Sequence, residues 1–445
     1  KVTKYTVKVD KTKPTVGELV ISGTKGDNGW YKSNVTFSVK NGSDSTSGHA
    51  TTTSSITSIT KDTKGTKVVV TTKDKAGNTS TKEYIVKMDK TAPIPGTLTI
   101  SGTKGLGEWY LSDVTLKVNN GSDSTSGHAT TTSTHTRVVG NTSGTVVTVT
   151  TKDKAGNTAT RKYTIRIDKN EPTAGTLIID GTLGENGWYV SDVKLSVSDT
   201  AGITSTLNIT KITSDTKGTE VTMTSKNNTT GAVKVTKYTV KVDKTKPTIG
   251  KLVINGTEGN NGWYKSNVTF SVTNGSDTLS GHATTTSSIS SITKDTKGTK
   301  VILTTKDKAG NITTKEYTIK MDKTAPTTPT SMNFVFGNWS QYTDNTWTNQ
   351  SIYAASTTSN PGPSGSSDTT SGLWKYQIST DNVNWVDYNY TASGIYLMST
   401  DGVHTRYFRA VDNAGNVSSI ISRTAKVDKT APTVPTVTYN SGSNS

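Results

Sequence analysis

The chain has 445 residues, a formal net charge of +16 and no cysteine. It is too long for a single hydrophobic core, because such cores stop growing near about 250 to 300 residues. The lack of cysteine excludes disulfides and thiolate metal sites, and no apolar run reaches the roughly 18 residues of a membrane-spanning helix.

Composition alone is typical of a disordered protein, since only 30% of the residues are hydrophobic and the net charge is high. The sequence pattern indicates the opposite. Thr, Val, Tyr and Gly are abundant, and these residues favour strands and turns. The apolar residues alternate with polar ones in short runs. We therefore predict an all-β protein with several thin cores.

A D-K-x-x-P element recurs along the chain and marks the borders of internal repeats. The element begins at Asp10, Asp89, Asp168, Asp243, Asp322 and Asp428, at spacings of 79, 79, 75, 79 and 106 residues. Between these points a W-Y pair, a G-S-D loop and a K-D-K-A-G-N segment follow in constant order. A unit of this size, with turn signals between short strands, is typical of a small β-sandwich.

Within the first repeat, Val35, Phe37 and Val39 alternate with polar residues, and the same alternation recurs at 84–88 and 163–167. Period two places the apolar residues on one face of a sheet. Threonine is β-branched and suits the solvated positions of a strand. The pattern therefore predicts strands with a Val/Ile inner face and a Thr-rich outer face.

Two repeats depart from the common pattern. In the third, S-D-T-A-G-I-T-S-T stands in place of the G-S-D loop, and K-N-N-T-T-G replaces K-D-K-A-G-N, while the strand pattern is kept. The scaffold therefore tolerates a changed loop. The last repeat opens with a segment rich in Trp and Tyr and ends with Y-F-R-A-V-D-N-A-G-N.

These landmarks predict a chain of five complete domains with partial repeats at both ends. The expected division is 1–13 (final strand of a preceding repeat), 14–92, 93–171, 172–246, 247–325, 326–431 and 432–445 (start of a following repeat or tail). The first 15 residues recur letter for letter at 234–248, where one repeat ends and the next begins, and no Met opens the chain. We therefore expect the sequence to be part of a longer array.

The D-K-T-A-P-T junctions, the S-D loop and the D-x-A-G-N segment resemble the bacterial Ig-like (Big-type) tandem repeats of surface proteins and adhesins. The last repeat is similar to Ig/fibronectin-like modules with a V-D-N-A-G-N motif. The resemblance covers nearly the whole chain and implies tandem immunoglobulin-like β-sandwiches. Such modules occur in adhesins, fibre proteins, cell-wall enzymes and glycoside hydrolases, so it specifies architecture better than role.

Proline in each junction fixes its own φ and keeps the preceding residue extended, which predicts short, stiff linkers. Five sandwiches of about 35 to 40 Å each predict an extended rod approaching about 200 Å. In some bacterial repeat adhesins, junction aspartates bind calcium between domains. The corresponding candidates here are Asp89, Asp168, Asp243 and Asp322. One or two carboxylates fall short of the six to eight oxygens that calcium takes, so we expect no cofactor, with calcium as the alternative.

Three other features have simple structural interpretations. Gly and Asn tolerate positive φ, so D-K-A-G-N is predicted to be a turn, and the W-Y pairs are predicted to pack in the core. A glycan site would need a cluster of exposed aromatic residues, and only the last repeat offers one. Those glycan-binding candidates are Trp339, Trp347, Trp374, Trp385 and Tyr388.

The sequence contains none of the motifs that carry catalysis or zinc. We find no G-x-S-x-G, H-E-x-x-H or Gly-rich phosphate loop. The histidine that recurs at the same place in each typical repeat, such as His49, lacks a second ligand at zinc-binding spacing. We therefore expect no enzymatic activity, no catalytic residue and no cofactor-binding residue.

Positive charge is concentrated in the repeats before residue 326. The segment 14–92 has 11 lysines and 7 acidic residues, whereas the chain from 326 onward has 6 basic and 7 acidic residues. Lysines are interspersed with aspartates and arginine is scarce, so nucleic acid is not an expected partner. A dispersed positive charge suits anionic cell-wall polymers such as teichoic acid.

These features favour a non-catalytic structural or adhesive segment of a bacterial extracellular surface protein or fibre. Such a segment would act as a stalk or filament-building array on the cell surface or in the cell wall, and the lack of cysteine favours a Gram-positive surface. Its expected partners are neighbouring repeats, anionic wall polymers, host or environmental glycans, and other copies in a homo-oligomeric fibre. The alternative is a set of spacer or glycan-binding modules in a large secreted cell-wall or polysaccharide-degrading enzyme.

Overall fold

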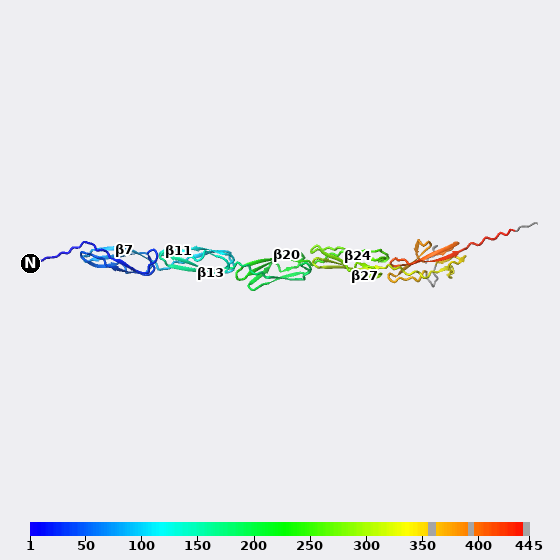
Figure 1. The fold of residues 1–445 in the computed structure, drawn as a ribbon, viewed down its shortest axis with the longest axis horizontal. Helices are drawn as coiled ribbons and strands as arrows, with labels where there is room; N and C mark the ends of the chain where they lie inside the picture. Colours follow the sequence, from blue (N-terminus) through cyan, green and yellow to red (C-terminus); the bar gives the residue numbers. More distant parts are fainter. Residues whose placement is uncertain (355–361, 390–395, 439–445) are drawn as a thin grey trace, which may run out of the picture. The chain divides into compact units, whose positions relative to one another are not determined.

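The computed structural model describes residues 1–354, 362–389 and 396–438. Within these ranges the chain forms short strands joined by turns, with one three-residue 3-10 segment at Asn260–Gly262 and no α-helix (Figure 1). The predicted all-β array of sandwiches is therefore confirmed. No helix among the described residues is long and apolar enough to cross a membrane.

The chain divides into two compact units, and the border between them runs through the third repeat. The first unit comprises Lys1–Ile178, Leu195–Thr210 and Val221–Tyr238, and the second comprises Ile179–Lys194, Lys211–Glu220 and Thr239–Ser445. Of the predicted terminal segment 432–445, residues 439–445 lie outside the described part of the chain.

The first and second repeats have seven strands each. Those of the first are β1 (Glu18–Ser22), β2 (Trp30–Tyr31), β3 (Val35–Lys40), β4 (His49–Ser54), β5 (Ser58–Ile59), β6 (Thr63–Asp74) and β7 (Thr79–Met88). Those of the second are β8 (Thr97–Ser101), β9 (Trp109–Tyr110), β10 (Val114–Asn119), β11 (His128–Ser133), β12 (Arg137–Val138), β13 (Thr142–Asp153) and β14 (Thr158–Ile167).

The third and fourth repeats keep the same strand succession. The third has β15 (Thr176–Asp180), β16 (Trp188–Tyr189), β17 (Val193–Ser198), β18 (Ile203–Leu207), β19 (Lys211–Ile212), β20 (Thr216–Asn227) and β21 (Val233–Val242). The fourth has β22 (Lys251–Asn255), β23 (Trp263–Tyr264), β24 (Val268–Thr273), β25 (His282–Ser287), β26 (Ser291–Ile292), β27 (Thr296–Asp307) and β28 (Ile312–Met321). The third repeat thus retains its strands although its loops differ.

The fifth repeat has an additional strand. Its described strands are β29 (Phe334–Phe336), β30 (Trp347–Thr348), β31 (Ile352–Ala354), β32 (Leu373–Ser379), β33 (Trp385–Asp387), β34 (Leu397–Met398), β35 (Gly402–Asp412) and β36 (Ile421–Val427). They form sheets of order β29-β31-β34 and β30-β36-β35-β32-β33. The extra strand, β33, extends one edge of the larger sheet.

Two sheets make up each sandwich, and their strand order is immunoglobulin-like. In the first repeat the orders are β1-β3-β5 and β2-β7-β6-β4. Neighbouring strands are antiparallel except β2 and β7, which run parallel with Trp30 opposite Lys87. The first strand segment therefore lies in one sheet and the second crosses to the other, as in immunoglobulin-like sandwiches with separate ABE and CFG sheets.

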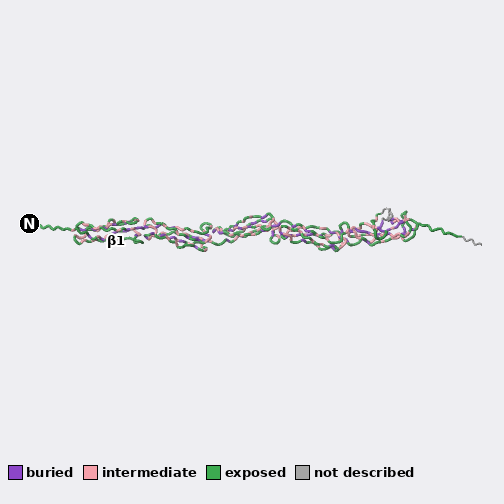
Figure 2. Tube along the Cα trace, turned by 90° about the horizontal axis from the view of Figure 1, so that it is seen from above, coloured by how far each residue is buried: buried purple, intermediate pink, exposed green. Residues whose placement is uncertain are grey.

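The cores are narrow and lie between the two sheets, so that buried residues run along the inside of each repeat in Figure 2. On β3, Val35 and Phe37 are buried whereas Thr36 and Ser38 are exposed, which confirms the predicted alternation. The inner faces of the first, second and fourth repeats carry mainly Val and Ile. The fifth repeat has a more aromatic core that includes Phe334 and Phe408.

A fully buried hydroxyl side chain recurs in the long sixth strand of the first four repeats. It accepts the backbone N–H of the glycine just before the first strand. The pairs are Thr72 with Gly17 (3.0 Å), Thr151 with Gly96 (2.9 Å), Ser225 with Gly175 (3.1 Å) and Thr305 with Gly250 (3.1 Å). Each bond joins the two sheets. It also satisfies the glycine N–H, since a buried N–H must find a partner inside the protein.

Candidate functional site

Three aspartates from separate parts of the sequence meet where the linker enters four of the five repeats, as far as the structure describes them. The clusters are Asp10, Asp44 and Asp74; Asp89, Asp123 and Asp153; Asp243, Asp277 and Asp307; and Asp322, Asp368 and Asp412. In each cluster, one carboxylate oxygen per residue lies within 4.8 Å of the other two. The members come from the D-K-x-x-P element, the S-D loop and the end of the second-to-last strand.

The fold brings these residues together because three chain segments converge at one end of the sandwich. At the junction between the first and second repeats, Asp89 directly follows β7, and its N–H donates to the carbonyl of Tyr31 at 2.9 Å. Asp123 lies in the loop between β10 and β11, and Asp153 is the last residue of β13. The cluster therefore joins the end of one sandwich to two loops of the next.

Backbone groups hold two of these carboxylates in place. The Ser126 N–H donates to Oδ2 of Asp89 at 3.0 Å, although the two residues belong to different repeats. The Gly127 N–H donates to Oδ1 of Asp123 at 2.8 Å. The equivalent of the first bond occurs at Asp243, which accepts from Ser280 at 3.1 Å.

The third carboxylate is bound by the asparagine of the D-K-A-G-N turn. Oδ1 of Asp153 accepts the Asn157 N–H at 2.8 Å, and Oδ2 accepts its Nδ2 at 2.9 Å. Gly156 has a φ of 95°, which confirms that the segment is a turn. The Asn157 Nδ2 also donates to the carbonyl of Asp89 at 3.0 Å, so the turn is tied to the linker as well.

Burial and neighbouring negative charge set the electrostatics of the clusters. Asp89, Asp243 and Asp322 are fully buried. Burial raises the pKa of each carboxyl, and the adjacent cluster aspartate raises it further. Among the described residues, no lysine or arginine forms an ion pair with a cluster aspartate. Backbone N–H groups lower the pKa of Asp44 and Asp123 in the same clusters, so a proton or a cation is favoured chiefly at the three fully buried carboxylates.

The donor set fits calcium in part. Oxygens bound to one calcium ion lie about 2.3 to 2.6 Å from it, so they are at most about 5 Å apart. The 4.8 Å spread of the three carboxylate oxygens meets that limit. Three carboxylates supply at least three of the six to eight oxygens required, and water or bidentate binding would have to supply the rest. In the first cluster, Oδ2 of Asp10 is buried without a hydrogen-bond partner among the described residues.

Of the four sequence-predicted calcium candidates, Asp89, Asp243 and Asp322 lie in clusters, whereas Asp168 is in none within the described part of the chain. The third repeat has four residues between β17 and β18, where the second has eight between β10 and β11. Its Asp199 accepts the Ser205 N–H at 2.8 Å, and Asn227 stands at the turn in place of an aspartate. Asp168 is therefore not joined by two further carboxylates.

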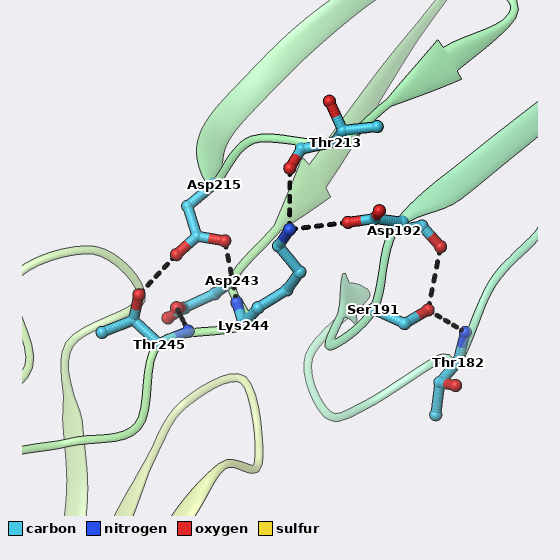
Figure 3. A network of polar contacts seen from close by, with 8 residues as sticks. All are labelled: Thr182, Ser191, Asp192, Thr213, Asp215, Asp243, Lys244 and Thr245. Atoms are coloured by element: carbon cyan, nitrogen blue, oxygen red, sulfur yellow. Dashed lines mark hydrogen bonds and ion pairs between the residues drawn. The ribbon is translucent and has the colours of Figure 1, made fainter.

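The lysine of the D-K element has a role that the sequence did not reveal (Figure 3). Lys244 Nζ donates to Oδ1 of Asp192 at 2.6 Å and to the Thr213 carbonyl at 2.7 Å. Its backbone N–H donates to Oδ1 of Asp215 at 3.0 Å, while Oδ2 accepts the Thr245 hydroxyl at 2.5 Å. This network fixes the linker to its own sandwich before the next repeat begins.

The aromatic glycan candidates do not form one platform. Trp347 and Trp385 lie on β30 and β33, the opposite edges of the larger sheet, whereas Trp339 follows β29 of the smaller sheet. Trp374 lies on β32, beside β33, with Lys375 Nζ 3.8 Å from the centre of its ring. Arg409 similarly covers the ring of Trp385, at 4.2 Å, and Tyr388 packs against the core.

The loop and turn aspartates of the clusters were not predicted from the sequence, because Asp89 and Asp153 are 64 residues apart. The available signal was the third repeat, in which the S-D-x-T-S-G loop and the turn aspartate are lost together. The W-Y pairs follow the prediction in part: Trp30, Trp188 and Trp263 are 7 to 8% exposed, whereas in the second repeat Tyr110 is buried and Trp109 is half-buried.

No protein-family model matches the sequence, and no curated protein has a significant match. Membership of the bacterial Ig-like family therefore stays a prediction. Among solved structures, a tetra-tandem repeat from the extending region of a large adhesion protein is 14% identical, with 95% of this chain and 94% of that chain covered and a TM-score of 0.18. Domains 4–9 of the surface layer protein SbsC are 13% identical, with coverages of 92% and 81% and a TM-score of 0.18.

The D1–D4 fragment of the ICAM-5 ectodomain is 8% identical to the chain. The alignment covers 70% of this chain and all of that fragment, with a TM-score of 0.29. TM-scores of this size are too low to carry the role of any of these proteins over to this chain.

Proposed function

We propose that the chain is a non-catalytic structural or adhesive segment of a bacterial extracellular surface protein or fibre, serving as a stalk or filament-building array. The main observation in support is that hydrogen bonds connect successive sandwiches across their short linkers. The linker after β7 extends only from Asp89 to Gly96, and Asn157 of the next sandwich binds the Asp89 carbonyl at 3.0 Å. Such junctions suit spacing and load transmission better than a flexible tether.

Small-angle scattering of the full chain tests this proposal. Five sandwiches held on stiff junctions should give a maximum dimension approaching about 200 Å, from roughly 35 to 40 Å per sandwich. A maximum dimension near that of a compact 47.2 kDa sphere would contradict a stalk.

Positive charge on the repeats supports an anionic cell-wall polymer, such as teichoic acid, as the partner on a Gram-positive surface. Exposed lysines on the outer strand faces would bind it through long-range attraction, which salt screens. Retention of the full chain on purified teichoic acid should therefore fall steeply between low and physiological ionic strength. Binding that is insensitive to salt would point to a different partner.

Calcium at the aspartate clusters is part of the same proposal. An ion held by Asp89, Asp123 and Asp153 would join the end of one sandwich to two loops of the next, and so would stiffen the junction. Asp89 and Asp153 are fully buried and Asp123 is half-buried, without a basic partner among the described residues, which supports a cation. Isothermal titration of the metal-free chain with calcium is the direct measurement, and no heat up to about 10 mM, beyond the range of extracellular calcium modules, would exclude the ion.

The alternative proposal is a spacer or glycan-binding module of a large secreted enzyme. The exposed rings of Trp347 (60%) and Trp374 (47%) support it, although they lie on different strands. Binding of the chain to a glycan array, with Trp374→Ala and Trp385→Ala as variants, tests the glycan-binding part of this alternative. Unchanged binding in both variants would remove these residues from any glycan site.

A further inference from the structure

Four of the sandwiches carry a tight loop of sequence T-x-G-x-x-x-W just before their second strand. We call residues 24–30, 103–109, 182–188 and 257–263 the glycine loops. In each, the glycine N–H donates to the tryptophan carbonyl at 2.8 to 2.9 Å, which closes the loop. The loops project from the sandwich at the side where the next repeat begins, since the tryptophan pairs with the last strand.

Each glycine loop contacts the turn that follows the second-to-last strand of the next sandwich. We call these turns, residues 74–78, 153–157, 227–231, 307–311 and 412–416, the acceptor turns. The residue after the loop glycine donates its N–H to a carbonyl of the acceptor turn. The bonds are Asp27 to Ala155 (2.9 Å), Leu106 to Thr230 (2.9 Å), Glu185 to Ala309 (2.8 Å) and Asn260 to Ala414 (2.9 Å).

At three of the four junctions an asparagine side chain adds a second bond. Nδ2 of Asn28 donates to the Lys154 carbonyl at 2.9 Å, and Asn186 and Asn261 make the same bond at 2.8 and 3.1 Å. These asparagines have φ values of 48° to 53°, a conformation that asparagine tolerates better than most residues. Both the recurring asparagine and its backbone conformation thus indicate that the contact between glycine loop and acceptor turn is specific.

The loop glycine is required by the neighbouring sandwich. A Cβ added to Gly26 would lie 2.3 Å from the Ala155 carbonyl oxygen, and one added to Gly184 would lie 2.2 Å from that of Ala309. Gly105 and Gly259 show the same approach at 2.3 Å. Real Cβ atoms do not come this close to backbone oxygen, so any other residue would separate the two sandwiches at this contact.

The acceptor turn of the first sandwich receives no glycine loop from the described part of the chain. Its Ala76 is exposed, whereas Ala155, Ala309 and Ala414 are fully buried in acceptor turns that are engaged. A cavity of about 620 Å³ lies beside Ala76, lined also by Asp10, by residues of the Asp44 loop and by the segment before Asp10.

The chain itself suggests what fills this cavity. All four glycine loops are engaged, and the corresponding loop of the fifth sandwich has Thr343, four residues before Trp347, in place of the glycine. A second copy of the chain therefore offers no free glycine loop. Residues 1–15 are identical to residues 234–248. In the third repeat, residues 234–248 form most of β21 and the linker to the fourth sandwich. The acceptor turn of that fourth sandwich binds the glycine loop 182–188 of the third.

We infer that the open acceptor turn of the first sandwich is a docking site for the glycine loop of another sandwich, of the third-repeat type. Docking would bring the two hydrogen bonds seen at the third-to-fourth junction, from the N–H of the Glu185 position and the amide of the Asn186 position, to the carbonyls of Ala76 and Lys75. Ala76 would become buried, like its three counterparts. This inference does not depend on the role proposed for the whole chain.

Because the chain lacks cysteine, thiol labelling can test the docking one site at a time. Single-cysteine variants Ala76→Cys, Ala155→Cys and Val139→Cys are made in the full chain, where Val139 is an exposed control. We expect the thiols introduced at positions 76 and 139 to react quickly. The thiol at position 155 should react at least about tenfold more slowly, which corresponds to about 1.4 kcal/mol of opening free energy. Gly26→Ala should accelerate labelling at position 155 alone.

The decisive experiment uses an extended variant with a copy of residues 172–233 added ahead of Lys1. Because residues 1–15 repeat residues 234–248, this addition completes a sandwich of the third-repeat type. In this extended chain we expect the thiol of Ala76→Cys to label at least about tenfold more slowly. The glycine-to-alanine change at the added Gly184 position should restore fast labelling. A second extension, with a copy of residues 247–321 in place of residues 1–9, keeps the test valid if the first added sandwich does not fold.

Equal labelling at position 76 in the original and extended chains, with the added sandwich protected from proteolysis, would overturn the inference. Protection of this thiol that rises with the concentration of the original chain would also overturn it, because a second copy would then be the occupant.

Discussion

The first and second sandwiches are joined differently from the second and third. At the first junction, Asp89 meets Asp123 and Asp153, and a glycine loop also docks. At the second, Asp168 belongs to no carboxylate cluster of the described residues, yet Leu106 still donates its N–H to Thr230 at 2.9 Å. The aspartate cluster and the glycine-loop contact are therefore separable, and the strands of the third sandwich form without the cluster.

The sandwich fold thus depends on its cores and inter-sheet hydrogen bonds, while the clusters concern the junctions. A shortened loop removes the equivalent of Asp123 from its place. Ser225 nevertheless binds the glycine before the first strand, as Thr151 does in the second repeat. The third sandwich is therefore an internal reference for the effects of the aspartate clusters.

The largest effect is expected for the buried tryptophans, which both kinds of repeat share. Trp188→Ala in the third sandwich and Trp263→Ala in the fourth should each destabilise their own sandwich by about 3 to 5 kcal/mol, because each removes a large buried ring. Hydrogen exchange with mass spectrometry, read on the last strand of each repeat, measures this. Unequal losses would mean that the ring serves different roles in the two sandwiches.

Calcium should act on the repeats that have clusters and should leave the third unchanged. With the millimolar dissociation constants of extracellular calcium modules, about 10 mM calcium should stabilise the clustered sandwiches by about 1 to 3 kcal/mol. Exchange protection with and without EDTA is the measurement. Asp307→Asn should abolish the effect in the fourth sandwich only, and a uniform response of all five would refute a site at the clusters.

Loss of the buried hydroxyl should cost less, about 1 to 2 kcal/mol, because it leaves one buried N–H unpaired. Thr305→Val in the fourth sandwich frees the Gly250 N–H, and Ser225→Ala in the third frees that of Gly175. We expect both changes to accelerate exchange of these glycine amides. Thr304→Val, on the outer face of the same strand, serves as a control and should have little effect.

The smallest effect concerns pH in the metal-free chain. Burial raises the pKa of Asp243 in the folded state, so its contribution to stability is complete below the unfolded pKa and is lost as pH rises through the folded value. Without a cation, Asp243→Asn should therefore stabilise the chain slightly near about pH 7 and not near about pH 4. Calorimetry in EDTA at the two pH values checks this, with Asp168→Asn as the matched control.

Most of the fold could be predicted from the sequence. Alternation at Val35 and Phe37 and the repeated turn segments indicated the strands, because period two and positive-φ residues act locally. The W-Y pairs were assigned to the core, and one member of each is buried, whereas Trp109 and the tyrosines of the other three pairs are half-buried.

The candidate site was only partly predictable, because its parts meet through register and not through sequence proximity. Asp89 stood out as a junction residue, but nothing local indicated that Asp123 and Asp153 would face it. The network around Lys244 was missed for the same reason, as Asp192 lies 52 residues before it. Asp168 was grouped with the other junction aspartates. The shorter loop between β17 and β18 leaves it without the two further carboxylates that the others have among the described residues.

The parallel pairing of β2 with β7 has a mechanical consequence. When a sandwich is pulled by its two ends, these neighbouring strands are drawn in opposite directions along their length. The bonds around Trp30 and Lys87 are then sheared together instead of being opened one after another. The two-residue parallel pairing of these strands therefore resists the tension. The same pairing recurs at Trp109, Trp188, Trp263 and Trp347.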